Sequence, residues 1–380
     1  MRVAAIVAVF ALSLGVAQAS DAFGNTLVTH EWGTFTSVAG DTGSPVPWAP
    51  LFGPADLPCF VLRGGTGNLP KRLVTGLVRM ETPVLYFYSQ HPVTASVHVD
   101  FPKGSITEWY PDARVTSKGA SSNGTADWDA VHILPGQKLE FPTSTGASHY
   151  YAARNTDAAP LRIGDQQEKM IFYRGVGNFL PPLWPKYTFN GKLEIRNTGA
   201  DPIPAAIVFE NHGDKLGYRI VRAITDSVTV DPPELTGDIQ QLRQRLAIEL
   251  EEFGLYRKEA QAMVETWRDS WFEEGTRVFY ILPTAQVNPL LPLTITPAPA
   301  EIARVFVGRV EVLSPWTRQA IESAMSNGDV ATLTKFGRFL DPFLAQSRLK
   351  NPNGAAAQRT NAYLANAQSE VARTAGSCVQ

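Results

Sequence analysis

The sequence predicts an α+β fold, with a β-sandwich-rich N-terminal region followed by a mixed, helix-rich C-terminal region. From Phe23 to about Ile224, short β-prone runs are broken by Gly, Pro, Asn and Asp at intervals of about 8–12 residues, which is typical of all-β sandwiches. The composition agrees, because 30 Gly, 28 Pro and only 18% charged residues favour strands joined by turns. After Pro232, apolar residues recur at helical spacing. We therefore divide the chain into a β-rich region over 20–230, with two sandwich units as one interpretation, and a mixed α/β region over 231–380.

The first nineteen residues have the pattern of a secretory signal peptide. Arg2 precedes an apolar run from Val3 to Val16, and the small-x-small tripeptide Ala17–Ala19 follows. The apolar run is shorter than the roughly 20 residues that a bilayer-spanning helix needs. No second run of spanning length follows, so we expect a secreted or periplasmic protein that does not span a membrane after signal removal.

Strands are indicated most clearly at three places in the β-rich region. Val84–Tyr88 has the continuous apolar character of a buried strand, whereas residues 96–101 alternate polar and apolar side chains like a half-exposed one. Lys192–Arg196 and Ala205–Phe209 flank the turn-prone segment Asn197–Asp201. This last pattern predicts a hairpin.

Helices are indicated in the C-terminal region. Apolar residues from Ile239 to Phe253 form one helical stripe, and Ala260–Trp271 forms a second in which two tryptophans four residues apart favour a packed core. Ser314 followed by Pro315 is a good N-cap and first-turn pair for a helix through about Met325.

Four segments carry a resemblance to a known group of proteins: Thr29–Ser37, Met80–Tyr88, Trp271–Gly275 and Val307–Leu313. With them the chain resembles a family of uncharacterised secreted bacterial proteins that have a His-Glu-Trp-Gly-Thr-Phe segment near the mature N-terminus. The resemblance implies secretion and one shared architecture. It implies no activity, and no catalytic residue is transferred through it.

Charge and cysteine content narrow the function classes. The net charge of -2 comes from 34 basic and 36 acidic residues, which gives no basic footprint for nucleic acid. We therefore expect no nucleic-acid partner. In an oxidising compartment, the two cysteines Cys59 and Cys378 are a candidate disulfide; the alternative is that both stay reduced.

Five ionisable residues of the β-rich region are candidates for catalysis: His30, Glu31, His98, Asp100 and Glu108. On an extended segment, His30 and Glu31 point to opposite faces, whereas His98 and Asp100 share one. A His beside carboxylates can hold a metal or act as an oriented base. These residues support a hydrolase, with a divalent metal as an allowed cofactor, although each has a purely structural explanation as well.

Three aromatic residues are candidates for ligand binding. Trp109, Tyr110 and Trp128 lie in segments rich in Pro, Asp and Gly, and loops of a β-sandwich are a frequent place for a binding surface. We therefore take non-catalytic binding of a glycan or another extracellular polymer as the leading hypothesis. The hydrolase is its alternative.

Overall fold

The computed structural model describes residues 26–50, 57–64, 71, 74–116, 123–145, 148–337, 339–344 and 354–374. The chain is mixed α/β, with 41% strand and 24% helix. This confirms the strand-rich α+β prediction at its coarsest level. The predicted signal peptide and Cys378, one partner of the predicted disulfide, lie outside the described residues.

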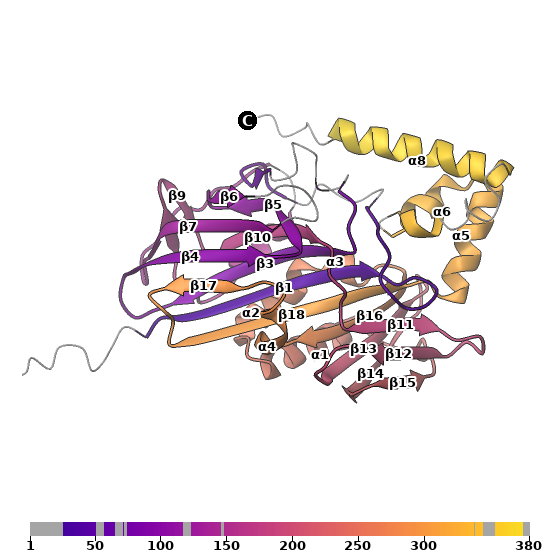
Figure 1. The fold of residues 1–380 in the computed structure, drawn as a ribbon, viewed down its shortest axis with the longest axis horizontal. Helices are drawn as coiled ribbons and strands as arrows, with labels where there is room; N and C mark the ends of the chain where they lie inside the picture. Colours follow the sequence, from indigo (N-terminus) through magenta and orange to yellow (C-terminus); the bar gives the residue numbers. More distant parts are fainter. Residues whose placement is uncertain are drawn as a thin grey trace, which may run out of the picture.

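A nine-stranded sheet forms the centre of the molecule (Figure 1). Its order is β14 (Leu216–Ile224), β13 (Ile203–Asn211), β16 (Gly275–Leu282), β18 (Glu301–Val312), β1 (Val28–Val38), β3 (Val78–Tyr88), β10 (Ile171–Gly177), β5 (Gly104–Tyr110) and β2 (Leu62–Arg63). β1 pairs with β18 in parallel and with β3 in antiparallel orientation. The sheet therefore takes strands from both sides of residue 230, where the sequence places a domain boundary.

Two smaller sheets accompany the central one. The first has the order β11 (Leu183–Tyr187), β12 (Leu193–Asn197) and β15 (Ser227–Val230). The second contains β17 (Leu293–Thr296), β4 (Val93–Phe101), β7 (Gly124–Ile133), β8 (Leu161–Ile163), β9 (Gln166–Glu168) and β6 (Arg114–Thr116). The predicted hairpin is wrong, because β12 and β13 belong to different sheets; the turn between them carries the chain from one sheet to the other.

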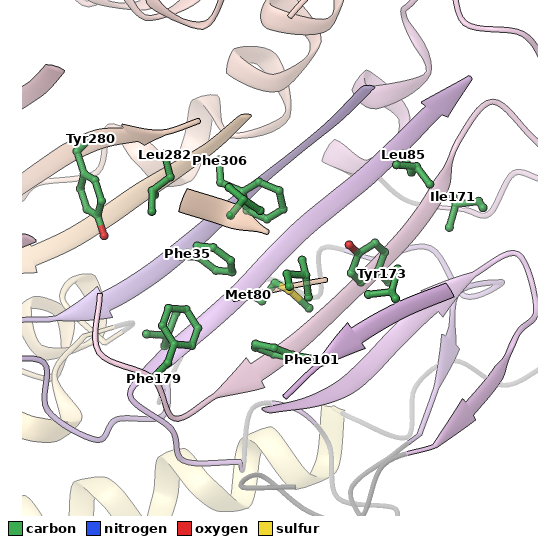
Figure 2. Packing of buried hydrophobic residues seen from close by; sticks show 14 of the residues in the cluster. Phe35, Met80, Leu85, Phe101, Ile171, Tyr173, Phe179, Tyr280, Leu282 and Phe306 are labelled. Atoms are coloured by element: carbon green, nitrogen blue, oxygen red, sulfur yellow. The ribbon is translucent and has the colours of Figure 1, made fainter. Parts of the chain in front are cut away.

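The smaller sheets cover one face of the central sheet. Figure 2 shows part of the apolar cluster between them, in which Phe35 stacks on Phe306 with ring centroids 4.9 Å apart. Phe101 comes from β4, whose alternating burial matches the predicted half-exposed strand. Apolar contact on this scale is the main favourable term in holding the layers together.

Helices cover the opposite face. α1 (Ile239–Glu252), α2 (Arg257–Thr266), α3 (Arg268–Trp271) and the 3-10 helix η2 (His149–Arg154) contribute to a second apolar cluster on that face. Trp267 and Trp271 are buried in it, which confirms that they belong to a core. The short α4 (Thr284–Val287) contacts β16 and β18.

The C-terminal helices form a separate apolar cluster at one end of the molecule (Figure 1). They are α5 (Pro315–Asn327), α6 (Val330–Lys335) and α8 (Ala355–Thr374). α5 begins as predicted, because the Ser314 side chain accepts a hydrogen bond from the Thr317 amide and Pro315 occupies the first turn. Within the described part of the chain, no helix combines the length and apolar character needed to cross a membrane.

Candidate functional site

His30 and Glu31 lie on opposite faces of β1, as predicted for neighbouring residues of a strand. His30 faces the helices, and its Nδ1 lies 2.8 Å from Oε2 of Glu259 on α2. Glu31 faces the smaller sheets, where its Oε2 accepts a hydrogen bond of 2.6 Å from Nε of Arg304. Both side chains are fully buried, so the two cannot act as one catalytic pair.

Glu31 belongs to a buried polar network that joins three strands. Besides the Arg304 guanidinium, the hydroxyl of Tyr173 donates to Glu31, and Nη1 of Arg304 donates to Asn288. Burial, followed by the Glu31 charge, raises the pKa of Tyr173 well above its usual range, so the phenol stays protonated. This arrangement fixes β1 against β18 and leaves Glu31 without access to solvent.

His98 and Asp100 share one face of β4, as predicted, but that face is the outer surface of the six-stranded sheet. His98 lies between two carboxylates, with Nδ1 at 2.7 Å from Asp127 and Nε2 at 3.3 Å from Asp100. The hydrogen bond with Asp127 is the main cause of a raised His98 pKa, which favours a charged imidazolium. A histidine held in this way is poorly suited to accept a proton or a metal ion.

His30 and His98 occupy different layers, so the predicted catalytic residues do not converge. Among the described residues, no group of three or more His, Cys, Asp or Glu side chains has the geometry to hold a metal ion. The described residues therefore form no recognisable site for a divalent metal ion.

The three aromatic candidates do not form an exposed platform. Tyr110 and Trp128 are 4% and 1% exposed, and the Trp128 indole donates a hydrogen bond to the carbonyl of Pro111. Trp109 is half-buried against the apolar cluster between the sheets. Ligand binding through Tyr110 or Trp128 would need the core to open.

A different set of polar side chains does converge, at one end of the helix-covered face of the central sheet. Thr36 lies directly opposite Arg309 on one side and Arg79 on the other, and Arg174 lies opposite Glu108. Directly opposed residues in neighbouring strands present their side chains on the same face. We call this set the sheet-end cluster; it consists of Lys71, Arg79, Glu81, Glu108, Arg174, Arg277, Arg309 and Glu311.

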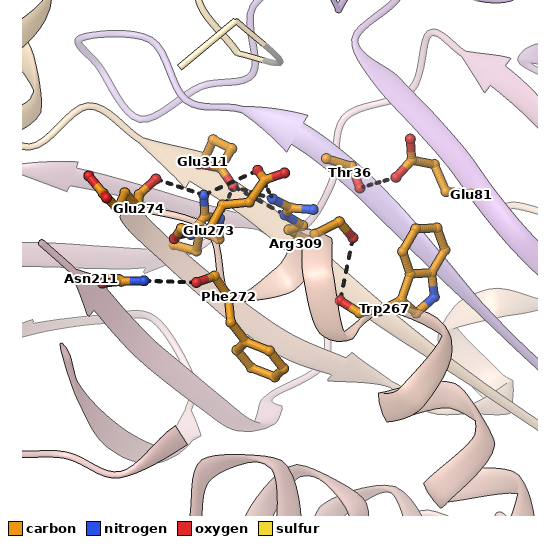
Figure 3. A network of polar contacts seen from close by, with 11 residues as sticks. Thr36, Glu81, Asn211, Trp267, Phe272, Glu273, Glu274, Arg309 and Glu311 are labelled. Carbon is orange, nitrogen blue, oxygen red and sulfur yellow. Dashed lines mark hydrogen bonds and ion pairs between the residues drawn. The ribbon is translucent and has the colours of Figure 1, made fainter. Parts of the chain in front are cut away.

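One half of the sheet-end cluster is a network around Glu311 (Figure 3). The carboxylate of Glu311 accepts hydrogen bonds from Arg277 and, at 3.0 Å, from Nη2 of Arg309. Both arginines also lie 3.6 Å from Oε2 of Glu273. The side chains of Arg277, Arg309 and Glu311 are each at least 93% buried. This is therefore a structural ion network that is screened from water.

The other half surrounds Lys71. The ammonium nitrogen of Lys71 donates to the Met80 carbonyl at 2.9 Å and lies 3.7 Å from Oε2 of Glu108. That same carboxylate oxygen accepts a hydrogen bond from the hydroxyl of Thr107. The Arg79 guanidinium donates to the carbonyl of Lys71 itself, so the neighbouring strand fixes the backbone that carries the amine.

Burial lowers the pKa of Lys71 from 10.5 to about 7. Glu108 acts in the opposite direction, and the cationic Arg174 and Arg79 lower it further. A lysine with this pKa is about half neutral at pH 7, and a neutral amine is both a base and a nucleophile. Strongly shifted groups of this kind are concentrated at functional sites.

Aromatic rings pack on the arginines of the sheet-end cluster. The guanidinium carbons of Arg79 and Arg309 lie 5.6 Å and 4.8 Å from the ring centroids of Trp48 and Phe339. Arg174 lies 6.0 Å from the ring of Trp267. Each ring covers one face of a guanidinium and strengthens the electrostatic interactions within the cluster.

Of the sheet-end cluster, only Glu108 is among the residues that the sequence analysis selects. A signal for others exists, because Arg309 and Glu311 alternate with valines in a run that otherwise has the pattern of a buried strand. Charged residues on the buried face of such a strand need partners. Lys71 lies outside any periodic pattern, and no sequence signal marks it.

Comparisons with known proteins add no family to these observations. No protein-family model matches the chain, and no curated protein matches it either.

Proposed function

We propose that this chain is an extracytoplasmic hydrolase in which Lys71 is the general base and Glu108 is its charged partner. The observation that carries the proposal is the position of the Lys71 amine, which is buried and lies 3.7 Å from the buried carboxylate of Glu108. Lysines are almost never buried without a specific role or partner. The secreted or periplasmic location rests on the signal-peptide pattern of the first nineteen residues.

The chemistry follows from the protonation states. Neutral Lys71 accepts a proton from a water molecule while the water oxygen attacks the carbonyl carbon of an ester or amide. The resulting ammonium is stabilised by the Glu108 carboxylate, and the negative charge on the carbonyl oxygen by a nearby guanidinium, for which Arg174 is our candidate. Collapse of the tetrahedral intermediate breaks the bond to the leaving group, which takes the proton back from Lys71.

The scaffold suits this proposal because the cluster residues other than Lys71 lie on strands of the central sheet, and the Arg79 guanidinium holds the Lys71 carbonyl. We also propose that the six-stranded and nine-stranded sheets form the β-sandwich expected from the sequence. Their shared apolar cluster, with Phe101 on one side and Met80 on the other, supports this interpretation.

The hypothesis of a polymer-binding aromatic platform is less well supported, because Tyr110 and Trp128 are buried.

The test measures Lys71 directly before any substrate is known. The rate of acetylation of each lysine is followed by mass spectrometry from pH 6 to pH 11, and we expect Lys71 to become reactive near pH 7. Exposed Lys103 is the internal control for the reactivity of the reagent. If Lys71 does not become reactive near pH 7, the proposed base is wrong.

Activity is then tested on a panel of esters and amides. Lys71→Met should lower kcat/KM by about 10²–10⁴-fold, and the wild-type rate should fall below pH 7 as the amine becomes protonated. Lys103→Met should leave the rate unchanged. An active protein whose rate is insensitive to Lys71→Met would contradict the proposal.

A further inference from the structure

A polar cleft of about 330 Å³ lies at the other end of β3 from the sheet-end cluster. Arg79 and Glu81 are near the start of β3, whereas Tyr88, its last residue, lines the cleft. The loop over 135–137, the segment over 156–160 and Lys169 complete the wall. The volume is at the small end of the range for ligand sites, which suits a ligand of one or two sugar rings.

The Tyr88 wall of the cleft is fixed from behind. The Tyr88 hydroxyl donates a hydrogen bond of 2.7 Å to Oε1 of Glu259, whose other oxygen contacts His30 and accepts from the Tyr256 amide. Burial and the Glu259 charge raise the pKa of Tyr88, so its hydroxyl stays protonated. The predicted site residue His30 thus acts as a support beneath this wall.

Thr156 is the second observation that points to a ligand. Thr156 is only 8% exposed, yet its Oγ1 has no hydrogen-bond partner in the structure. A buried hydroxyl that lacks a partner is unfavourable, and such groups usually bond to something in the functional state. Because Thr156 lines the cleft, a ligand hydroxyl in the cleft is well placed to supply that partner.

The charges around the cleft favour an acidic ligand. Asp157 is already paired with Lys258, whose Nζ lies 2.5 Å from its Oδ1. Lys169 also lines the cleft and adds a cationic group. The Lys258 ammonium neutralises Asp157, so the Lys169 ammonium is the lining charge left to attract a ligand carboxylate.

We propose that this cleft binds a saccharide that carries a carboxylate, such as a uronic acid unit. Lys169 would bind the carboxylate, and Thr156 would exchange hydrogen bonds with a sugar hydroxyl. Ser89, whose hydroxyl already donates to the His91 carbonyl, would accept a hydrogen bond from another. Mixed donors and acceptors beside one aromatic side chain suit a polyhydroxylated ring better than an apolar ligand. The proposal is independent of the hydrolase proposal, since the cleft and Lys71 lie at opposite ends of β3.

The test is calorimetric titration of the full chain with glucuronic acid, glucose and acetate. We expect glucuronic acid to bind and the other two to bind at least tenfold more weakly. Lys169→Met and Thr156→Val should each weaken glucuronic acid binding by about tenfold or more, because each loses a hydrogen bond to the ligand.

Matched controls separate the cleft from general effects. Thr266→Val also removes a buried hydroxyl without a partner, but Thr266 does not line the cleft. Lys138→Met removes a charge from an exposed residue next to the cleft wall. Both variants should bind glucuronic acid like the wild type. Absence of glucuronic acid binding, equal binding of glucose or acetate, or binding that survives Lys169→Met and Thr156→Val would overturn the proposal.

Discussion

At the scale of single residues, Lys71 links the proposed chemistry to a measurable effect on stability. The folded-state pKa of about 7 is below the unfolded value of 10.5, so between these pH values the unfolded chain binds a proton that the folded chain does not. The free energy of unfolding therefore gains a contribution that rises with pH, at about 1 kcal/mol per pH unit. Below pH 7 both states bind the proton and the contribution is constant.

Lys71→Met removes this contribution. Denaturant unfolding of wild type and Lys71→Met is compared at pH 7, 8 and 9. We expect the free energy of unfolding of the wild type to rise, relative to that of the variant, by about 1 kcal/mol at each step. Lys103→Met, at an exposed position, should show a constant difference from the wild type. Parallel pH profiles for wild type and Lys71→Met would mean that the pKa of Lys71 is not lowered.

The sequence predicts single residues only as far as local geometry decides them. The opposite faces of His30 and Glu31, and the common face of His98 and Asp100, follow from the two-residue period of a strand and are confirmed. Which of these faces meets another layer depends on packing between distant segments. For this reason the sequence groups His30 with His98, although they occupy different layers.

At the scale of elements, the buried ion pair between Glu31 and Arg304 joins β1 to β18. Glu31→Gln would leave the Arg304 guanidinium buried without its carboxylate, and we expect the free energy of unfolding to fall by about 3–5 kcal/mol. The double variant Glu31→Leu with Arg304→Met removes both charges and should recover much of that loss. Denaturant unfolding measures each value.

A surface glutamate gives the matched comparison. Glu265 pairs with Arg243 and Arg268 but is 40% exposed, so Glu265→Gln should cost less than about 1 kcal/mol. A Glu31→Gln variant as stable as Glu265→Gln would contradict the structural role assigned to Glu31.

Element types are more predictable than element partners. The helix over Ile239–Glu252 and the Ser314 cap of α5 match the prediction, because helix periodicity and capping are local properties. The wrong hairpin has the opposite origin. Turn residues between β12 and β13 permit a reversal of the chain, but they do not specify whether the next strand pairs with its neighbour or enters another sheet.

At the scale of the whole molecule, the predicted division at residue 230 can be tested by truncation. A chain that ends there lacks β16 and β18, which lie between β13 and β1 in the strand order. We expect such a fragment to show no cooperative unfolding transition by tryptophan fluorescence, whereas the full chain unfolds cooperatively. A cooperative transition in the fragment would establish the β-rich region as an independent domain.

The parallel pairing of β1 with β18 also affects how the chain can be made. Val28 lies opposite Glu301, so a ribosome must add more than 270 residues after Val28 before the first residue of β18 exists. Until then β1 is the edge of an incomplete sheet, and a long apolar edge recruits other strands and aggregates. The nascent chain therefore needs either a chaperone on that edge or a delay in folding until synthesis is nearly finished.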